Sequence, residues 1–179
     1  MRTSGRVGMI AVLTVLITSV AGTAPSARDQ SEKAAPRPDG PQEADVVAVA
    51  LDPRTQAPAI VLQGKRDKRN LVMSIDPTQM MAIAIPLNGV TPPRPLTHDL
   101  FLTLFARLKV TLTRVVITDM RDDIFYATVH LTSTGGEMVL DSRPSDAIAL
   151  AIRAKVPVLV EDRVFDKGGA QAAPRRPSI

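Results

Sequence analysis

Two short polar segments carry the side chains best suited to chemistry, and each stands where a helix is expected to begin. The segments are "RPLTHDL" and "LDSRPSDAIAL". Their polar side chains are those of Arg94, Thr97, His98, Asp99, Asp141, Arg143, Ser145 and Asp146. Histidine titrates near neutral pH and can serve as a general acid or base. Aspartates bind hard divalent cations, and arginine binds a phosphate through two parallel hydrogen bonds.

Both segments also have a purely structural explanation. An acidic residue in the first turn of a helix interacts favourably with the helix dipole, which accounts for Asp99 and Asp146 without catalysis. The same helix end binds phosphate, and Arg143 would reinforce that contact. After Asp146 the helix is apolar on nearly all sides up to Arg153. Its polar start therefore either opens into a cleft or belongs to an internal hydrogen-bonded network, and both interpretations stay open.

The remaining polar motifs favour structural roles. His130 lies on the polar face of an expected strand, and the acidic segment "DMRDD", residues 119–123, is typical of a hairpin turn. The chain has no cysteine, which excludes disulfides, thiolate metal sites and a cysteine nucleophile. Glycine-rich phosphate loops and the H-E-x-x-H and G-x-S-x-G motifs are absent from the sequence as well.

Hydrophobic periodicity predicts the elements that must position these residues. Strands are expected over residues 46–51, 59–63, 70–75, 111–118, 124–132, 137–141 and 156–161. Helices are expected over residues 77–85, 98–109 and 144–155. Thr97 is the expected N-cap of the second helix, and Pro86 is expected to end or kink the first. The pattern predicts an α+β domain with a mixed sheet of about seven strands and about three helices.

The two ends of the chain differ from its middle. Residues 1–27 resemble a secretory signal peptide, with two arginines, a 14-residue apolar run and then small residues. Because the run is short for a membrane span, we expect export to the periplasm or the cell exterior and no stable span in the mature chain. An uncleaved N-terminal anchor is the less favoured alternative. Residues 28–44 predict a flexible linker, 45–167 the single domain, and 168–179 a disordered tail.

The charge of the domain argues against a general nucleic-acid binder. The chain has a net charge of +4, but seven basic and four acidic residues lie outside residues 45–167, which leaves the domain near +1. General nucleic-acid binders usually present a strongly basic face. The densest basic segment, "KRDKR" at residues 65–69, falls at an expected hairpin loop. We interpret it as a solvated turn rather than a nucleic-acid patch.

Four segments together resemble the bifunctional nuclease (BFN) domain family. They are "VVAVALDPRTQAPAIVL", "GVTPPRPLTHDL", "RVVITDMRDDIFYATVHL" and "LDSRPSDAIALAIRAKVPVLVEDRVF". They follow one another in the family's order and spacing and cover essentially all of residues 45–165. The combination of R-P-x-T-H-D-L with D-x-R-P-S-D-A-I-A-L-A is highly specific. The eight polar residues named above occupy the family's motif positions.

The resemblance implies an α+β fold, nuclease activity toward DNA and RNA, and a homo-oligomer. The chain departs from the family pattern in the first expected helix. Asp76 stands where the family usually has glycine, and Gln79, Met80 and Met81 supply no acidic residue in the first helical turn. A catalytic acid at that place would therefore be missing here.

The leading hypothesis is a nuclease that hydrolyses the phosphodiester bonds of DNA or RNA with the help of a metal. Asp99, Asp141 and Asp146 would hold a divalent cation, Mg²⁺ or Mn²⁺, with His98 as acid or base and Arg143 on the scissile phosphate. This hypothesis requires the two polar helix starts to meet in one cleft. The competing hypothesis is a non-catalytic binding or assembly module, in which Asp141, Arg143 and Asp146 form a buried structural network.

Overall fold

The computed structural model describes residues 40–53 and 55–172. The expected signal peptide, residues 28–39 of the expected linker and residues 173–179 of the expected tail lie outside these ranges. The described elements are β1 (Gln42–Leu51), β2 (Pro58–Gly64), β3 (Asn70–Ser74), α1 (Pro77–Leu87), α2 (Thr97–Arg107), β4 (Thr111–Arg121), β5 (Ile124–Ser133), β6 (Gly136–Ser142), α3 (Pro144–Ala154), β7 (Val158–Val160) and α4 (Asp162–Ala172). Within the described ranges, no helix is both long and apolar enough to cross a membrane.

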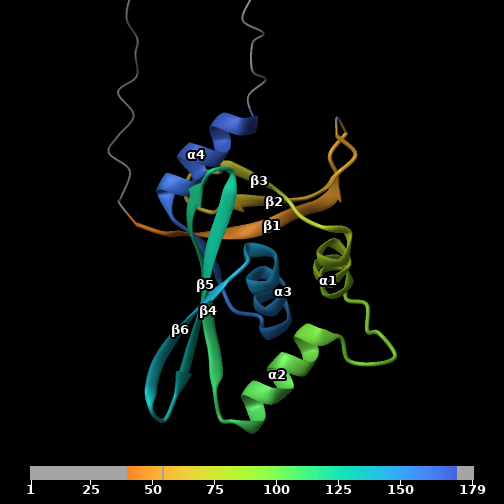
Figure 1. Ribbon diagram of the computed structural model, residues 1–179, viewed down its shortest axis with the longest axis vertical. Coiled ribbons are helices and arrows are strands. Elements are labelled where there is room, and N and C mark those ends of the chain that lie inside the picture. Colours follow the sequence, from red (N-terminus) through yellow and green to blue (C-terminus); the bar gives the residue numbers. More distant parts are fainter. Residues whose placement is uncertain (1–39, 54, 173–179) are drawn as a thin grey trace, which may run out of the picture. The chain divides into compact units, whose positions relative to one another are not determined.

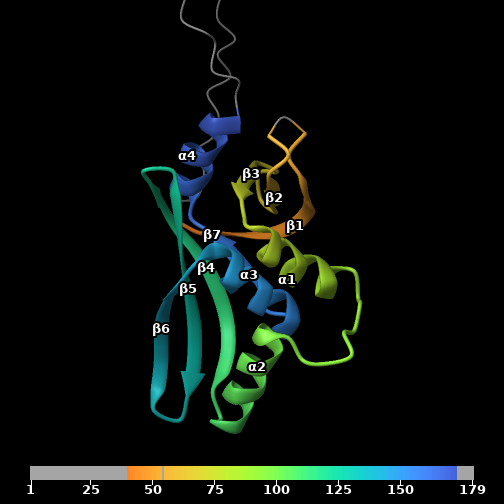
Figure 2. The same ribbon diagram turned by 45° about the vertical axis from the view of Figure 1, so that its right-hand side comes forward.

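The described strands form a seven-stranded mixed sheet in the order β3-β2-β1-β7-β4-β5-β6. The short strand β7 pairs antiparallel with β1 and parallel with β4, so it joins the meander β1–β3 to the meander β4–β6. In Figures 1 and 2, α1, α2 and α3 lie on one side of β1 and β7, and α4 lies on the other. The predicted α+β fold with a mixed seven-stranded sheet is confirmed, and α4 adds a helix to those expected.

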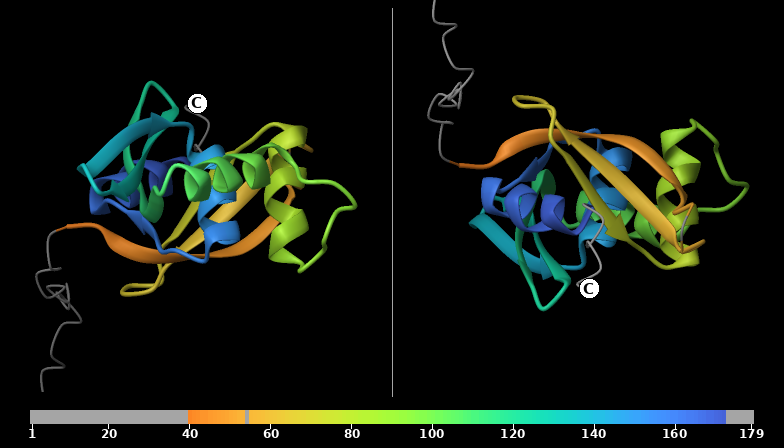
Figure 3. Two further views of the ribbon diagram at one scale, coloured as in Figure 1. Left: turned by 90° about the horizontal axis from the view of Figure 1, so that it is seen from below. Right: turned by 90° about the horizontal axis from the view of Figure 1, so that it is seen from above.

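The core is built around α3. Residues 147–151 of this helix are all buried, and the helix packs against α1, α2, β4 and β5. The period-two pattern of β5 places Ala127, Val129 and Leu131 in the core, as the alternation predicted. In the view from below in Figure 3, α1 (yellow-green) and α2 (green) lie at the surface nearest the viewer. Because α1 and α2 both pack against α3, the first turns of the three helices lie in one region of the domain.

α1 ends one residue after Pro86, close to the end that the sequence predicted. The helix continues through Pro86 to Leu87. A proline in a helix lacks the N–H that would bond the carbonyl four residues earlier, here that of Ala82. Arg153 of α3 donates from Nη1 to this oxygen at 2.7 Å. A side chain from a neighbouring helix thus satisfies the carbonyl that the proline leaves open.

The described secondary structure extends beyond residues 45 and 167. β1 begins at Gln42 and α4 continues to Ala172. In α4, Phe165 is buried beneath the guanidinium of Arg69, 4.8 Å from the ring centroid. Gly168 allows a close approach, because a Cβ at this position would lie 2.2 Å from Leu71 Cδ1. Two glycines weaken the helical pattern of this segment, so tertiary packing rather than propensity stabilises the helix.

The basic turn between β2 and β3 is tied to the start of α4. Arg66 and Arg69 each form an ion pair of 2.6 Å with Asp162, and Arg69 also pairs with Asp67 and Asp166. Burial acts to raise the pKa of Asp67, but hydrogen bonds from Arg69 and Gln42 outweigh it and lower the pKa to about 2. The segment "KRDKR" is thus a hairpin turn as predicted, but its arginines bind α4 as well as facing solvent.

Candidate functional site

A cavity of about 980 Å³ opens where three helices begin. Each of α1, α2 and α3 contributes side chains from its first turn or N-cap. These side chains are those of Thr78, Gln79, Thr97, His98, Arg143 and Asp146. The rest of the wall is mostly apolar, apart from Asp141 and Ser142 at the end of β6. The first four backbone N–H groups of a helix have no partner within it, so three partly positive helix ends face one space.

Local sequence explains why each helix begins here. Asp76 is the N-cap of α1, where its Oδ1 accepts a hydrogen bond from the backbone N–H of Gln79 at 2.9 Å. α1 and α3 both have proline at the first helical position, which suits the fixed φ of that residue. In α2 the N-cap is Leu96, not Thr97 as predicted. The carboxylate of Asp99 reaches back to the backbone N–H of Leu96 at 2.8 Å and replaces the expected threonine cap.

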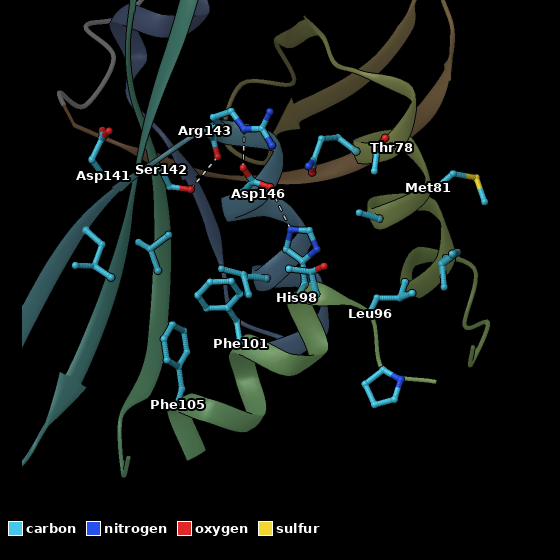
Figure 4. A pocket seen from close by; sticks show the side chains of 18 residues that line it. Thr78, Met81, Leu96, His98, Phe101, Phe105, Asp141, Ser142, Arg143 and Asp146 are labelled. Atoms are coloured by element: carbon cyan, nitrogen blue, oxygen red, sulfur yellow. Dashed lines mark hydrogen bonds and ion pairs between the residues drawn. The ribbon is translucent and has the colours of Figure 1, made fainter. Parts of the chain in front are cut away.

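A continuous set of polar contacts joins the three helix starts (Figure 4). Arg143 Nε donates to Asp146 Oδ2 at 2.7 Å, and His98 Nε2 lies 3.2 Å from Asp146 Oδ1. Arg143 Nη1 also lies 3.5 Å from Asp76 Oδ2. The prediction that the starts of α2 and α3 meet in one cleft is confirmed. Asp146 is the centre of the group, because its Oδ2 contacts Arg143 and its Oδ1 contacts His98.

The charge state of Asp146 follows from these contacts. Burial acts to raise the pKa of Asp146, but hydrogen bonds from Arg143 and His98 outweigh burial and hold this pKa below its usual value. An ionised carboxylate can only accept hydrogen bonds, so the facing Nε2 of His98 carries a proton. In the neutral imidazole, Nδ1 is then the nitrogen with a free lone pair. Asp146 therefore fixes both the orientation and the tautomer of His98.

Asp99 does not belong to this group, although the sequence assigned it a catalytic and metal-binding role. Its Oδ1 accepts from Arg153 Nε at 2.8 Å, and its Oδ2 is bound to the backbone N–H of Leu96. Arg153 is 6% exposed and also donates to the carbonyls of Ala82 and Ala149. Asp99 is absent from the cavity wall. We correct its expected position: Asp99 joins α2 to α3 and, through Arg153, to α1.

Asp141 also lies apart from the polar group. It lines the cavity from the end of β6, but it is exposed there, and Figure 4 shows its side chain well to one side of Arg143, Asp146 and His98. Among the described residues, no group of three or more His, Asp or Glu side chains is arranged to hold a metal ion. The expected cation site of Asp99, Asp141 and Asp146 is therefore not assembled by these residues, and we assign no step to a bound metal.

The three supporting residues named from the sequence have different positions. Thr97 lines the cavity at the first position of α2. Ser145 is buried at the second position of α3, behind the cavity wall rather than on it. Arg94 is exposed in the connection before α2 and does not line the cavity. Of the three, Thr97 alone faces the space where a ligand would bind.

His130 and the acidic turn lie away from the cavity. His130 Nδ1 is 3.1 Å from Glu137 Oε1 and 2.9 Å from Arg114 Nη2, on the other face of β5. The hydrogen bond with His130 is the main cause that lowers the pKa of Glu137, and the charge of Arg114 lowers it further. Asp119 forms an ion pair with Lys167, and residues 122 and 123 form the turn between β4 and β5. The structural roles expected for these residues agree with their contacts.

Comparison with known proteins places the chain in a family. The bifunctional nuclease domain model matches residues 60–173. The chain belongs to the bifunctional nuclease domain family. It is 35% identical over 127 residues to an uncharacterized protein of Mycobacterium tuberculosis, covering 71% of this chain and 76% of that protein. It is 33% identical over 134 residues to Bifunctional nuclease 1 of Oryza sativa subsp. japonica and to Bifunctional nuclease of Oryza minuta, covering 70% of this chain and 40% of each rice protein.

Sequence reasoning missed three residues that shape the site. Asp76 appeared as a departure from the family pattern, yet it reaches Arg143. Gln79 appeared as the place of a missing acid, yet its buried amide lines the cavity. Phe101 was not singled out, yet its exposed ring borders the cavity. The Asp-Pro start of α1 was the available signal, because it fixes which side chains occupy the first turn.

Proposed function

We propose that this protein of the bifunctional nuclease domain family hydrolyses phosphodiester bonds of DNA or RNA at the cavity described above. The observation that carries the proposal is the contact series from Arg143 through Asp146 to His98, set where three helix N-termini open into one cavity. The name of the rice relatives, bifunctional nucleases, supports the same reaction class. The Mycobacterium relative is uncharacterized and adds no argument about activity.

The substrate phosphate would bind at Arg143. Its side chain is 61% exposed and uses Nε for Asp146, so most of its five N–H donors remain for another acceptor. Helix N-termini bind phosphate through free backbone N–H groups and the helix dipole. The combined positive ends of α1, α2 and α3 offset the negative charges of Asp76 and Asp146 near the bound anion.

His98 and Asp146 would carry the proton transfers. In hydrolysis, water attacks phosphorus, the bond from phosphorus to the leaving oxygen breaks, and that oxygen takes a proton. With Nε2–H held by Asp146, His98 offers Nδ1 as the base that removes a proton from water. The resulting imidazolium is stabilised by the ionised Asp146 and can return a proton to the leaving oxygen.

The proposal is tested with the two histidines of the chain as a matched pair. His98→Asn should lower cleavage of a labelled DNA or RNA strand about 100-fold or more, since general acid–base catalysis contributes about that much. His130→Asn, which changes a histidine outside the cavity, should leave the rate within about threefold. Circular dichroism and urea unfolding confirm that both variants are folded. Equal rates for the two variants would contradict the proposal.

The competing function, a non-catalytic binding module, is favoured by one observation. The described residues do not assemble a three-ligand metal group, and both oxygens of Asp146 are already in contact. If the wild-type chain binds nucleic acid through Arg143 but cleaves none, this function replaces the first. Assays with EDTA and with added Mg²⁺ test the metal prediction separately, because Mg²⁺ often binds mainly through substrate phosphates.

We also propose that copies of the chain associate. β6 is an edge strand, with residues 136–141 exposed, including the apolar Met138 and Val139. Leu104 of α2 and Leu108, which follows the end of this helix, are exposed too, and neither lines the cavity. Exposed edges and clustered apolar side chains are common sites of association. Light scattering after gel filtration should give at least a dimer, which Val139→Lys should convert to monomer; a wild-type monomer would refute this.

Export to the periplasm or the cell exterior stays a prediction, because it rests on residues outside the described ranges. Cell fractionation with an antibody against the domain tests it. Full-length protein retained in the cytosolic fraction would refute it.

A further inference from the structure

Gln79 is a buried polar side chain in the cavity wall with an unsatisfied atom. It is 7% exposed, and among the described residues its Oε1 is a buried side-chain atom without a hydrogen-bond partner. Most buried polar atoms have such a partner, and an exception calls for a cause. The last torsion of glutamine is broad, so the amide can turn either its carbonyl or its NH₂ group toward a molecule in the cavity. This points to a ligand with hydrogen-bonding groups beside α1.

Phe101 supplies an aromatic surface in the same cavity. The ring is 48% exposed, and among the described residues it is the aromatic side chain in the exposed class. Phe105 packs against it edge-on, with ring centroids 6.2 Å apart, which holds the ring in place. In Figure 4, Phe101 lies between His98 and Phe105 along α2. An exposed ring face beside a polar group is the arrangement on which unpaired bases stack.

The cavity is larger than the polar group alone requires. Its volume of about 980 Å³ is at the upper end of the range for small-molecule sites. Much of the remaining wall is apolar, including the side chains of Met81, Phe101 and Leu140. A phosphate needs no apolar wall, whereas the flat face of a nucleobase does. The polar end and the apolar end together match a nucleotide rather than a phosphate alone.

We propose that the cavity binds an unpaired nucleobase, stacked on Phe101 and hydrogen-bonded at its edge to Gln79, next to a phosphate on Arg143. The substrate class is therefore single-stranded nucleic acid, since in a duplex the faces of the bases are stacked on one another and their pairing edges are occupied. The position of the phosphate rests on the proposed function. The base subsite rests on Gln79 and Phe101, which that function does not use.

The test uses the absence of tryptophan from the chain. Phe101→Trp introduces a single fluorophore at the proposed stacking position. A short single strand should quench this fluorescence, whereas the same strand without bases, or paired with its complement, should not. Leu104→Trp, on the same helix but off the cavity wall, is the matched control and should show no quenching.

Affinities complete the test, measured by fluorescence anisotropy while the strand is still intact. Phe101→Leu should weaken binding of the single strand about tenfold and leave binding of the abasic strand unchanged. Gln79→Met, of similar size but without the amide, should weaken binding several-fold for the base-bearing strand only. It should not lower the Tm, because it removes an unpaired buried atom. A lower Tm with unchanged affinity would mean that Gln79 is structural and would overturn its part of the proposal.

The two proposals fail in different ways. Equal binding of single strand, duplex and abasic strand, with no quenching in the Phe101→Trp variant, overturns the base subsite while leaving the comparison of His98 and His130 variants valid. Quenching by single strands without any cleavage overturns the nuclease and retains the subsite.

Discussion

Asp99 and Asp146 occupy the same place in two helices and yet belong to different parts of the molecule. Each is the third residue of its helix, and each accepts a hydrogen bond from an arginine Nε, at 2.8 Å from Arg153 and 2.7 Å from Arg143. Arg153 is 6% exposed and donates its other hydrogen bonds to backbone carbonyls. Arg143 is 61% exposed and borders the cavity.

The difference shows that residue type and helix position do not decide whether an ion pair is structural. In the Asp99–Arg153 pair the protein itself satisfies the donors, so little remains for a ligand. In the Asp146–Arg143 pair the donors of arginine remain available to one. Breaking a buried pair is costly, whereas an exposed pair contributes about 0–1 kcal/mol. Variants of the Asp99–Arg153 pair should therefore lose more stability, and variants of the Asp146–Arg143 pair should lose more activity.

Arg153→Met should cause the largest loss of stability, about 3 kcal/mol in the free energy of unfolding. It leaves one oxygen of Asp99 without its partner and removes the donor to the Ala82 carbonyl that Pro86 cannot satisfy. Urea unfolding measures the loss. Arg107→Met, at an exposed position of α2, is the control and should change stability by less than about 0.5 kcal/mol. A loss below about 1 kcal/mol for Arg153→Met would show that Arg153 does not stabilise the packing of α3 against α1 and α2.

Asp99→Asn should lower stability by about 2 kcal/mol, because hydrogen bonds to charged groups are worth about that much and Arg153 loses its counter-charge. The cleavage rate per folded molecule should stay within about twofold, since Asp99 does not line the cavity. Cleavage assays under conditions where the variant is folded test this. A rate loss of about 100-fold would restore the metal-binding role that the sequence suggested for Asp99.

Most of the fold could be predicted from the sequence because its elements have strong local patterns. The alternation in β5 and the apolar run of α3 specify faces that only the observed packing buries. The fourth helix could not be predicted, because α4 is held by contacts of Phe165 and Asp162 with residues about a hundred positions away. The hydrogen bond from Arg153 to the Ala82 carbonyl could not be predicted for the same reason, since Arg153 comes from another helix.

The site was half predictable. Helix-start chemistry identified His98, Arg143 and Asp146, because capping positions can be inferred from local sequence. It could not separate Asp146 from Asp99, because the deciding property is the exposure of an arginine elsewhere in the fold. Asp141 was named from its place in the motif, but the direction of a side chain at a strand end depends on register. The Asp-Pro start of α1 placed Gln79 in the first turn, but its burial in the cavity wall depends on the packing of other elements.

Asp146→Asn should lower stability at neutral pH by about 1 kcal/mol or less, since the group is partly exposed. The pKa of Asp146 is lowered in the folded state, so its charge stabilises the fold above the unfolded pKa, near 3.9, and this contribution is lost as the pH falls further. The stability curves of wild type and variant should therefore converge below about pH 4. Urea unfolding at a series of pH values measures this.

The cleavage rate of Asp146→Asn should fall about 100-fold, because His98 loses the carboxylate that fixes its tautomer. Asp141→Asn is the control within the same motif: Asp141 lines the cavity but has no contact with Asp146 or His98, so the rate should change by less than about threefold. If the two variants lower the cleavage rate equally, Asp141 and Asp146 both take part in the reaction. The assignment of Asp141 to a place outside the polar group would then be wrong.

Arg143→Ala should change stability least, by less than about 0.5 kcal/mol, because the guanidinium is mostly solvated in the free protein. The substitution should instead weaken the binding of nucleic acid. Loss of one phosphate contact should reduce the slope of log K against log salt by about 0.7 for a single strand. Arg143→Lys should restore the slope but not the cleavage rate, since an ammonium supplies the charge without the planar pair of donors. Affinities at several salt concentrations measure both variants. If Arg143→Ala instead destabilises the chain as much as Arg153→Met, the two pairs are both structural and the cavity loses its phosphate-binding residue.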